Sequence, residues 1–236
     1  MIEILTNEEF EKMKASGKIL QEVFKACRDF VKPGVSTHDV DKLCYDIIRS
    51  HDAIPSFLNY GQPPFPGTIC ASVNDEVVHG IPKKTRILQE GDILSVDVGA
   101  ILDGYHSDAC RTYLVGEVAP EVRHLVERTE KSFFEGLKYA QVGMRTGDIG
   151  HAVQEFCEGF GYVVVRELTG HGKKLTKGMA ICIEPMITLG SREIELLGDQ
   201  WTIVTQDGSP AAHYENTILI TDEGPFMTTY DYEEGF

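Results

Sequence analysis

The chain has 236 residues, of which 37 are acidic and 22 basic, so its formal net charge is −15. An acidic surface repels phosphates, so we expect no nucleic-acid partner. The hydrophobic fraction of 42% is typical of a globular protein, and no apolar run is long enough to span a membrane. No signal peptide is visible, and the six cysteines form no CxxC pair, which predicts reduced thiols in a cytoplasmic protein.

The first half of the chain predicts two helices followed by strands. Thr6-Asn7-Glu8-Glu9 is a capping box, and apolar residues at helical spacing follow it as far as Pro33-Gly34. A second helix is expected to begin near Ser36-Thr37. Extended segments are expected at 68–78 and 93–115.

The second half repeats this order. A helix is expected from Pro120, and Val142–Ile149 echoes Pro33–Val40 at a constant offset. Strands are then expected at 162–168, 179–188, 201–205 and 212–221. Two amphipathic helix pairs can match by chance, but the shared Gly–Thr–Asp register favours a duplication. We therefore predict an α+β fold in one domain of residues 1–236, with pseudo-repeats at about 6–115 and 119–222.

Two aspartates on a predicted hairpin are the strongest functional signal. Asp103-Gly104 between apolar-rich runs predicts a tight turn, which places Gly99 opposite Asp108 and Asp97 opposite Cys110. Asp97 and Asp108 then project from the same face as diagonal neighbours. Two carboxylates at that separation repel each other, and a bound cation would remove the conflict.

Three further side chains join this pair as candidate ligands. His171 lies between glycines after an apolar strand, and Glu184 and Glu215 each lie within an apolar strand. Glutamate is seldom fully buried without a partner, although each one alone is more often structural. Together with the aspartates, they make four carboxylates and one imidazole, a set that suits two divalent ions such as manganese, iron, cobalt or zinc.

The chain resembles the type I methionine aminopeptidases, a family with the pita-bread fold, over nearly its whole length. The resemblance rests on short stretches that occur in the same order, namely His79-Gly80-Ile81-Pro82, Ser95-Val96-Asp97-Val98-Gly99, Asp103-Gly104-Tyr105-His106-Ser107-Asp108, Gly170-His171-Gly172, Ile183-Glu184-Pro185-Met186 and Tyr214-Glu215-Asn216-Thr217. It implies two pseudo-symmetric helix-helix-sheet halves around a curved antiparallel sheet. It also implies a hydrolase that removes N-terminal methionine, preferring a small second residue.

The resemblance also implies a role for each ligand. Asp97 would chelate one metal ion, Asp108 and Glu215 would bridge both, and His171 and Glu184 would complete the other shell. A water shared by the ions would attack the first peptide carbonyl while the substrate's free amine sits at a metal. Glu184 would carry the proton from this water to the departing nitrogen.

Substrate contacts and partners follow from the same resemblance. His79 would hydrogen-bond the substrate near the scissile amide, and Phe65, Cys70 and Trp201 would line the pocket for the methionine side chain. From the sequence alone, these last three are core residues. The expected partners are nascent proteins or peptides that begin with methionine, and the ribosome. The expected protein is a cytoplasmic monomer.

One segment departs from the family pattern. Only Lys173 and Lys174 separate Gly172 from Leu175, where the family has a longer segment carrying a pocket phenylalanine and a second catalytic histidine. Losing one hydrogen-bond donor to a developing oxyanion typically costs about 10²–10³ in rate. His106 and His213 are possible replacements, but their spacing does not indicate it. An omitted loop, a paralog of altered activity and a deleted variant remain as explanations.

Three other functions are compatible with parts of this sequence pattern. His106 and Asp108, with His171 or His213, imitate the two-histidine, one-carboxylate iron site of oxygenases, but leave Asp97, Glu184 and Glu215 unexplained. Creatinase and proline-specific peptidases share the five ligands but carry an additional N-terminal domain. The non-enzyme alternative is a catalytically weakened metal-binding protein of the same fold that binds peptides or other partners.

Overall fold

Four helices form within residues 4–166 and 172–236, which are the residues that this computed structural model describes. They are α1 (Asn7–Phe30), α2 (Thr37–Ser50), α3 (Pro120–Leu137) and α4 (Thr146–Glu158). The predicted starts at Thr6, Ser36 and Pro120 are confirmed. Thr6 and Ser36 each form a capping box with the acidic residue three positions later, so both helices of the first half begin where local side chains satisfy free backbone N–H groups.

Within the described residues, the strands form three antiparallel sheets. The largest contains β1 (Ile54–Pro55), β2 (Ile69–Val73), β4 (Ile93–Leu102), β5 (Tyr105–Leu114), β7 (Ala180–Ile183), β12 (Glu215–Thr221) and β13 (Gly224–Met227). The second contains β3 (Glu76–Val78), β9 (Ile194–Leu196) and β10 (Ile203–Thr205). The third contains β6 (Val163–Val164), β8 (Met186–Thr188) and β11 (Ala211–His213).

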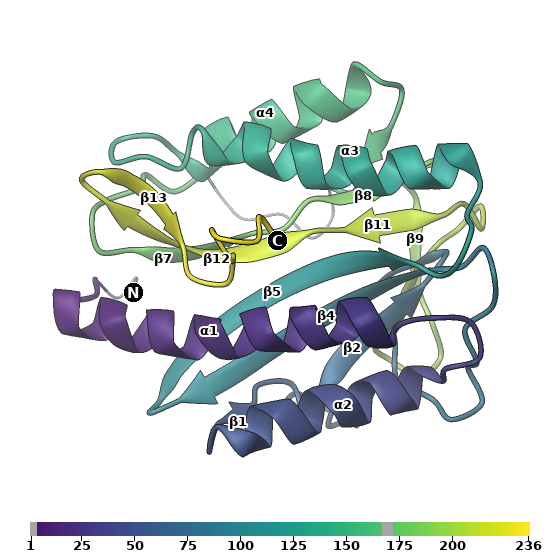
Figure 1. Cartoon of the computed structure of the whole chain (residues 1–236). Coiled ribbons are helices and arrows are strands. Elements are labelled where there is room, and N and C mark those ends of the chain that lie inside the picture. Colours follow the sequence, from purple (N-terminus) through teal and green to yellow (C-terminus); the bar gives the residue numbers. More distant parts are fainter. Residues whose placement is uncertain (1–3, 167–171) are drawn as a thin grey trace.

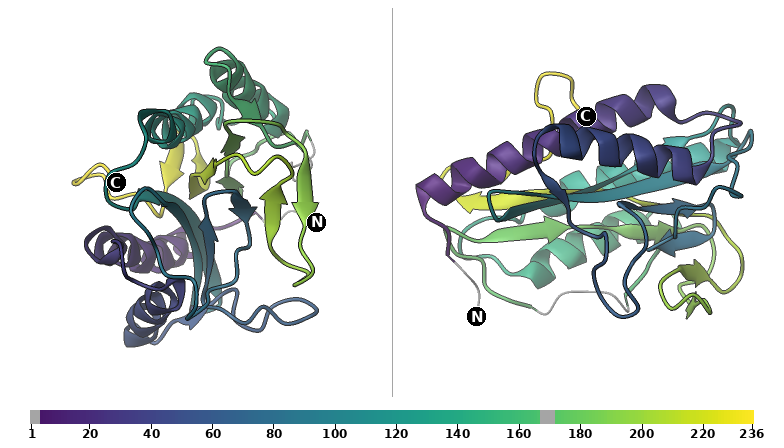
Figure 2. Two further views of the ribbon diagram at one scale, coloured as in Figure 1. Left: turned by 90° about the vertical axis from the view of Figure 1, so that its right-hand side faces the viewer. Right: turned by 90° about the horizontal axis from the view of Figure 1, so that it is seen from below.

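The two helix pairs lie on either side of the central strands, with α3 and α4 above and α1 and α2 below in Figure 1. In the first pair α1 packs on β4 and β5 and α2 packs on β1 and β2, whereas α3 packs on β11, β7 and β8. Figure 2 shows that each pair covers its own part of the strand layer. This arrangement of helices and antiparallel strands confirms the predicted α+β class.

Alternation along the strands separates an apolar face from a polar one. On β4, Leu94, Val96 and Val98 are fully buried in the same cluster as Leu20 and Phe24 of α1. Since successive side chains of a strand point to opposite faces, Asp97 must project away from the helices. α1 therefore stabilises one face of β4 and leaves the other face for the polar residues.

Several expected strands are shorter than predicted. The 179–188 segment is interrupted at Glu184-Pro185, and the 212–221 segment is interrupted at Tyr214. The 68–78 segment divides into β2 and β3 around an Asn74-Asp75 turn. Pro185 lacks the N–H that a strand needs, and Asn74-Asp75 is a turn signal, so two of the breaks have a local cause, whereas the break at Tyr214 has no such signal. The end of the 162–168 segment lies outside the described residues.

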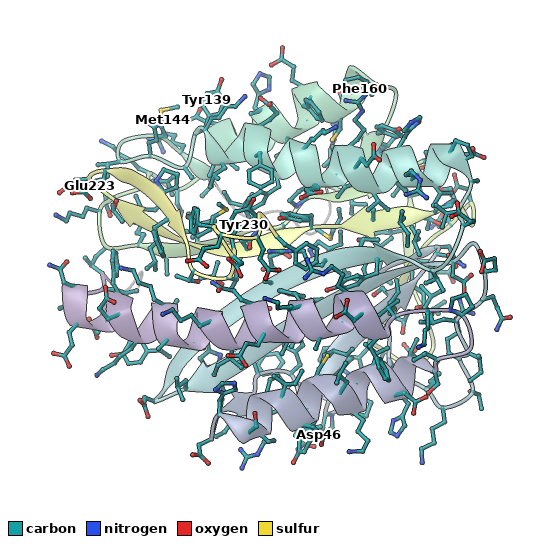
Figure 3. All side chains as sticks on the ribbon, in the orientation of Figure 1. Asp46, Tyr139, Met144, Phe160, Glu223 and Tyr230 are labelled. Carbon is teal, nitrogen blue, oxygen red and sulfur yellow. The ribbon has the colours of Figure 1, made fainter. Side chains whose placement is uncertain are left out.

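The C-terminal segment packs against α3. Tyr230, labelled in Figure 3, packs edge-on against Phe134 with ring centroids 5.8 Å apart.

All six cysteines are free, and all but Cys182 are buried. In the part of the chain that the structure describes, no helix combines the length and apolar character needed to cross a membrane.

Candidate metal centre

The β4–β5 hairpin places the first two candidate ligands. Asp103 and Gly104 both have positive φ angles, 51° and 83°, as a type I′ turn requires. The turn sets Leu102 opposite Tyr105, Gly99 opposite Asp108 and Asp97 opposite Cys110, which confirms the predicted register. Two residues with special backbone geometry thus determine where two carboxylates lie.

Neighbouring strands extend this arrangement into a row of polar side chains. Cys70 of β2 pairs with Asp97, Asp97 pairs with Cys110, and Cys110 pairs with Glu215 of β12. Glu215 is 3% exposed, although it is a glutamate. Paired residues on one face of a sheet have Cβ atoms about 4.5–5.5 Å apart. The pairing of β5 with β12 therefore brings a carboxylate from the second half of the chain to the hairpin aspartates.

The described residues form two groups of candidate ligand atoms that share Glu215. Oxygens of Asp97, Asp108 and Glu215 lie within 4.8 Å of one another, and so do ligand atoms of Glu184, His213 and Glu215. One carboxylate oxygen of Asp97 and one of Asp108 are buried with no hydrogen-bond partner. Unpaired buried oxygens are costly, so this cluster is incomplete as a purely structural one.

The carboxyl groups of the cluster have raised pKa values, as their burial and closeness lead one to expect. Burial, and then the charge of Glu184, raise the pKa of Asp97 from 3.8 to about 8. Burial, and then Asp97, raise the pKa of Asp108 well above its usual range. The pKa of Glu215 is also raised well above its usual range, by burial and then by Asp108. Glu184 thus disfavours the charged form of Asp97, Asp97 that of Asp108, and Asp108 that of Glu215.

Divalent cations fit this donor set. Carboxylate oxygens with one imidazole are ligands that manganese, iron, cobalt and zinc accept, and a cation would remove both the repulsion and the unpaired oxygens. The geometry separates the donors into two groups with one shared carboxylate, as a pair of adjacent ions requires. The cluster is therefore a candidate site for two ions.

Glu184 lies where two strands change sheets. β7 pairs with β12 in the large sheet, whereas β8 pairs with β11 in the third, and Glu184-Pro185 is the interruption between them. Pro185 has no N–H to donate, and its carbonyl accepts from the Tyr214 N–H at 3.4 Å. The Glu184 side chain is 48% exposed, and its partial burial raises its pKa. Glu184 can therefore face both the cluster and the solvent.

The sequence reasoning missed two side chains that hold the cluster in place. Arg111 is 2% exposed, donates to the Glu215 carbonyl at 2.6 Å, and lies between the rings of Phe24 and Tyr214. Thr217 Oγ1 accepts from the Asp108 N–H at 2.9 Å and donates to the Asp108 carbonyl at 2.8 Å. An arginine within a predicted strand was the available signal, because a cation that is buried there needs several hydrogen-bond acceptors.

Three of the four predicted substrate contacts lie together, and the fourth borders the cluster. Trp201 packs edge-on against Phe65 at 5.2 Å and against His79 at 6.2 Å between ring centroids. Cys70 faces Asp97 across the β2–β4 ladder. Burial lowers the pKa of His79, and a hydrogen bond with the Trp201 backbone opposes this effect. His79 has a φ of 59°, a left-handed conformation that is uncommon outside glycine.

The remaining predicted residues are placed as follows. His171 lies outside the described residues. The short connection that follows it is folded against α4, because Thr146 N–H donates to the Lys173 carbonyl at 3.0 Å and Leu175 N–H donates to the Met144 carbonyl at 2.7 Å. His106 is exposed, contacts Ser56 Oγ at 3.3 Å and belongs to neither group of ligand atoms. The oxygenase alternative therefore lacks its first histidine.

Comparisons with known proteins agree with this geometry. Residues 11–176 match the model of metallopeptidase family M24. A methionine aminopeptidase of Clostridium acetobutylicum is 46% identical, over 97% of this chain and 99% of that protein. The crystal structure of methionine aminopeptidase from Rickettsia prowazekii has a TM-score of 0.93 and 38% identity, covering 97% of this chain and 100% of that one.

A more distant structure bears on the fold alone. Prolidase from Pyrococcus furiosus has a TM-score of 0.76 at 19% identity, and this chain covers 65% of it. The predicted pita-bread fold is confirmed by these likenesses. The alignment with the Clostridium acetobutylicum relative extends over 249 positions, more than the 236 residues of this chain, so that relative has residues with no counterpart here.

Proposed function

Because the chain belongs to metallopeptidase family M24, we propose that it removes the N-terminal methionine from peptides and proteins by metal-dependent hydrolysis. The observation that carries this proposal is the convergence of Asp97, Asp108 and Glu215, from both halves of the chain, on one buried cluster. The near full-length likeness to methionine aminopeptidases supports the substrate. A small second residue is the preferred one.

The chain's own residues have distinct parts in the reaction. Asp97 would hold one divalent ion, Glu184 and His171 would hold a second, and Asp108 and Glu215 would contribute oxygens to both. Bound ions supply Lewis acidity, which lowers the pKa of water and polarises a carbonyl. Glu184, which is half exposed beside the cluster, takes a proton from the attacking water and returns it to the departing nitrogen.

The neighbouring residues orient the substrate. His79 donates a hydrogen bond near the scissile amide from a ring held beside Trp201. Phe65, Cys70 and Trp201 form the wall for the methionine side chain, and the two rings meet edge to face. A thioether packs favourably against aromatic rings, which favours methionine over shorter side chains.

We also propose that the chain acts as one domain, with the pseudo-repeats at about 6–115 and 119–222, as a monomer in the cytoplasm. Six free cysteines support a reducing compartment. Its substrates there are nascent chains that leave the ribosome. Size-exclusion chromatography with light scattering tests the monomer, since a dimer would double the 26.3 kDa mass.

The test of the function uses two tripeptides. Metal-loaded protein is incubated with Met-Ala-Ser and Met-Leu-Ser, and free methionine is measured. Release from the first peptide and little from the second is expected. No release from either peptide with manganese, iron, cobalt or zinc, despite bound ions, would favour the peptide-binding alternative, which the names of the relatives do not favour.

The short connection after Gly172 bears on the rate. It supplies no histidine between Gly172 and Leu175, so one donor to the developing oxyanion is absent. Such a loss typically costs about 10²–10³ in rate. We therefore propose that metal binding is retained more fully than the turnover rate.

A further inference from the structure

We propose that His213 is an imidazole ligand of the ion that Glu184 and Glu215 hold. His213 lies at the end of β11, two residues before Glu215, and both side chains therefore point to the same side of the chain as it passes from one sheet to the next. The proposal rests on the function proposed above, because it places a divalent ion in the same cluster.

The position of the ring nitrogen carries the argument. Nε2 of His213 lies 3.9 Å from Glu184 Oε2, and it forms a group with Glu184 and Glu215 in which all three ligand atoms are within 4.8 Å of one another. Two ligand atoms that each lie about 2.0–2.2 Å from one ion are at most about 4.4 Å apart, and the separation of 3.9 Å meets this limit. The 3.9 Å distance is too long for a hydrogen bond, so no direct bond to Glu184 occupies this nitrogen.

The His213 ring is buried, and its Nε2 has no hydrogen-bond partner among the described residues, 4–166 and 172–236. The residue is 2% exposed. A buried imidazole nitrogen with no partner is costly, and the large majority of buried polar atoms have one. The nitrogen is aimed at two carboxylates that already belong to a candidate ion site. An ion there would satisfy it.

The backbone around His213 holds the ring in this direction. The His213 N–H donates to Thr112 Oγ1 at 3.0 Å, and Thr112 Oγ1 donates to the His213 carbonyl at 2.8 Å. Thr112 is on β5, two residues beyond Cys110 in the row that contains Asp97 and Glu215. The histidine is therefore fixed to the same strands as the carboxylates, as a ligand has to be.

The test counts imidazole ligands directly. Protein labelled with ¹⁵N only at histidine is loaded with Co²⁺, and the hyperfine-shifted imidazole N–H resonances are recorded by NMR. His213→Gln keeps most of the side-chain volume and is expected to lose one of these resonances. Co²⁺ affinity, measured by titration, is expected to fall at least about 10-fold, since losing even the hydrogen-bond partner of a ligand costs 10–100-fold. His124→Ala, an exposed histidine of α3, is the control and should change neither quantity.

An identical set of shifted resonances in the wild-type and His213→Gln proteins would overturn the proposal. If the variant does not fold, the wild-type spectrum decides, because two shifted histidines are expected with His171 and a single one would contradict a role for His213. Methionine release by the wild-type protein is measured separately. Release with an unchanged resonance set refutes only the ligand role, whereas a lost resonance without release refutes only the proposed function.

Discussion

The two faces of β4 differ in what they contribute. The face toward α1 carries Leu94, Val96 and Val98, all fully buried in an apolar cluster, and the opposite face carries Asp97 with an unpaired buried oxygen. One face stabilises the fold through burial of apolar surface. The other destabilises the metal-free protein, because it holds like charges together. Side-chain alternation along one strand therefore places the residues that stabilise the fold on one face and the candidate metal ligand on the other.

The largest effect is expected from Asp97→Asn on the polar face. Methionine release from Met-Ala-Ser should fall at least about 10³-fold, since a metal ion supplies several kcal/mol of transition-state stabilisation and each tenfold corresponds to about 1.4 kcal/mol. The unfolding free energy of the metal-free protein should rise, because the repulsion with Asp108 is removed. Peptide assays and urea denaturation measure the two changes.

The control for this variant is Asp103→Asn, which makes the same chemical change at the tip of the same hairpin. Asparagine tolerates the left-handed conformation of this position, so neither activity nor stability should change appreciably. Equal losses of activity in both variants would contradict a special role for the polar face.

A change on the apolar face should lower the unfolding free energy and leave metal affinity nearly unchanged. Leu94→Ala removes a fully buried side chain and is expected to lower the unfolding free energy by about 2–5 kcal/mol with or without metal. Metal affinity, measured by calorimetry on folded protein, should remain within a few-fold of wild type. Leu196→Ala, on a residue that is 57% exposed, should have little effect. A large loss of metal affinity in Leu94→Ala would show that the two faces are not independent.

A smaller effect is expected from pH, which changes charge without changing any side chain. The pKa of Asp97 is raised from 3.8 to about 8 in the folded metal-free protein. This shift stabilises the fold fully below pH 3.8, and the stabilisation is lost as the pH rises through about 8. Between these values, the unfolding free energy contributed by this group should therefore decrease with increasing pH.

Urea denaturation of metal-free protein at several pH values measures this trend. The same series with Asp97→Asn should have a weaker dependence, and saturating metal should weaken it in the wild type. A metal-free wild type whose stability rises steadily between pH 5 and 8 would show that other groups outweigh the cluster.

The smallest effect is expected far from both faces. Ser36 caps α2 by accepting from the Asp39 N–H at 3.1 Å, and Ser36→Ala should lower the unfolding free energy by about 1 kcal/mol without changing activity. Ser50→Ala, at the exposed end of the same helix, should cost less, because water can replace its bond to a carbonyl. Thermal denaturation of both variants checks the difference. Equal costs would indicate that the cap is not formed.

Local chemistry explains which parts of the fold could be predicted. The helix starts at Thr6 and Ser36 follow from side chains three residues apart, and the hairpin register follows from Asp103-Gly104. Pro185 marks one strand break in the sequence, whereas the break at Tyr214 could not be predicted, because it arises where two strands exchange partners between sheets. Apolar patterning is the same on both sides of such an exchange.

The candidate site also has one part that the sequence predicts and one part that depends on the tertiary structure. The sequence by itself determined that Asp97 and Asp108 share a face, since a two-residue turn fixes every pair along a hairpin. Only the tertiary structure decided that Glu215 pairs with Cys110 across 105 positions of sequence, and that His213 turns its free nitrogen toward Glu184. The physical reason is range: turns and caps depend on neighbours in the chain, whereas strand pairing and the burial of a ring depend on packing between distant segments.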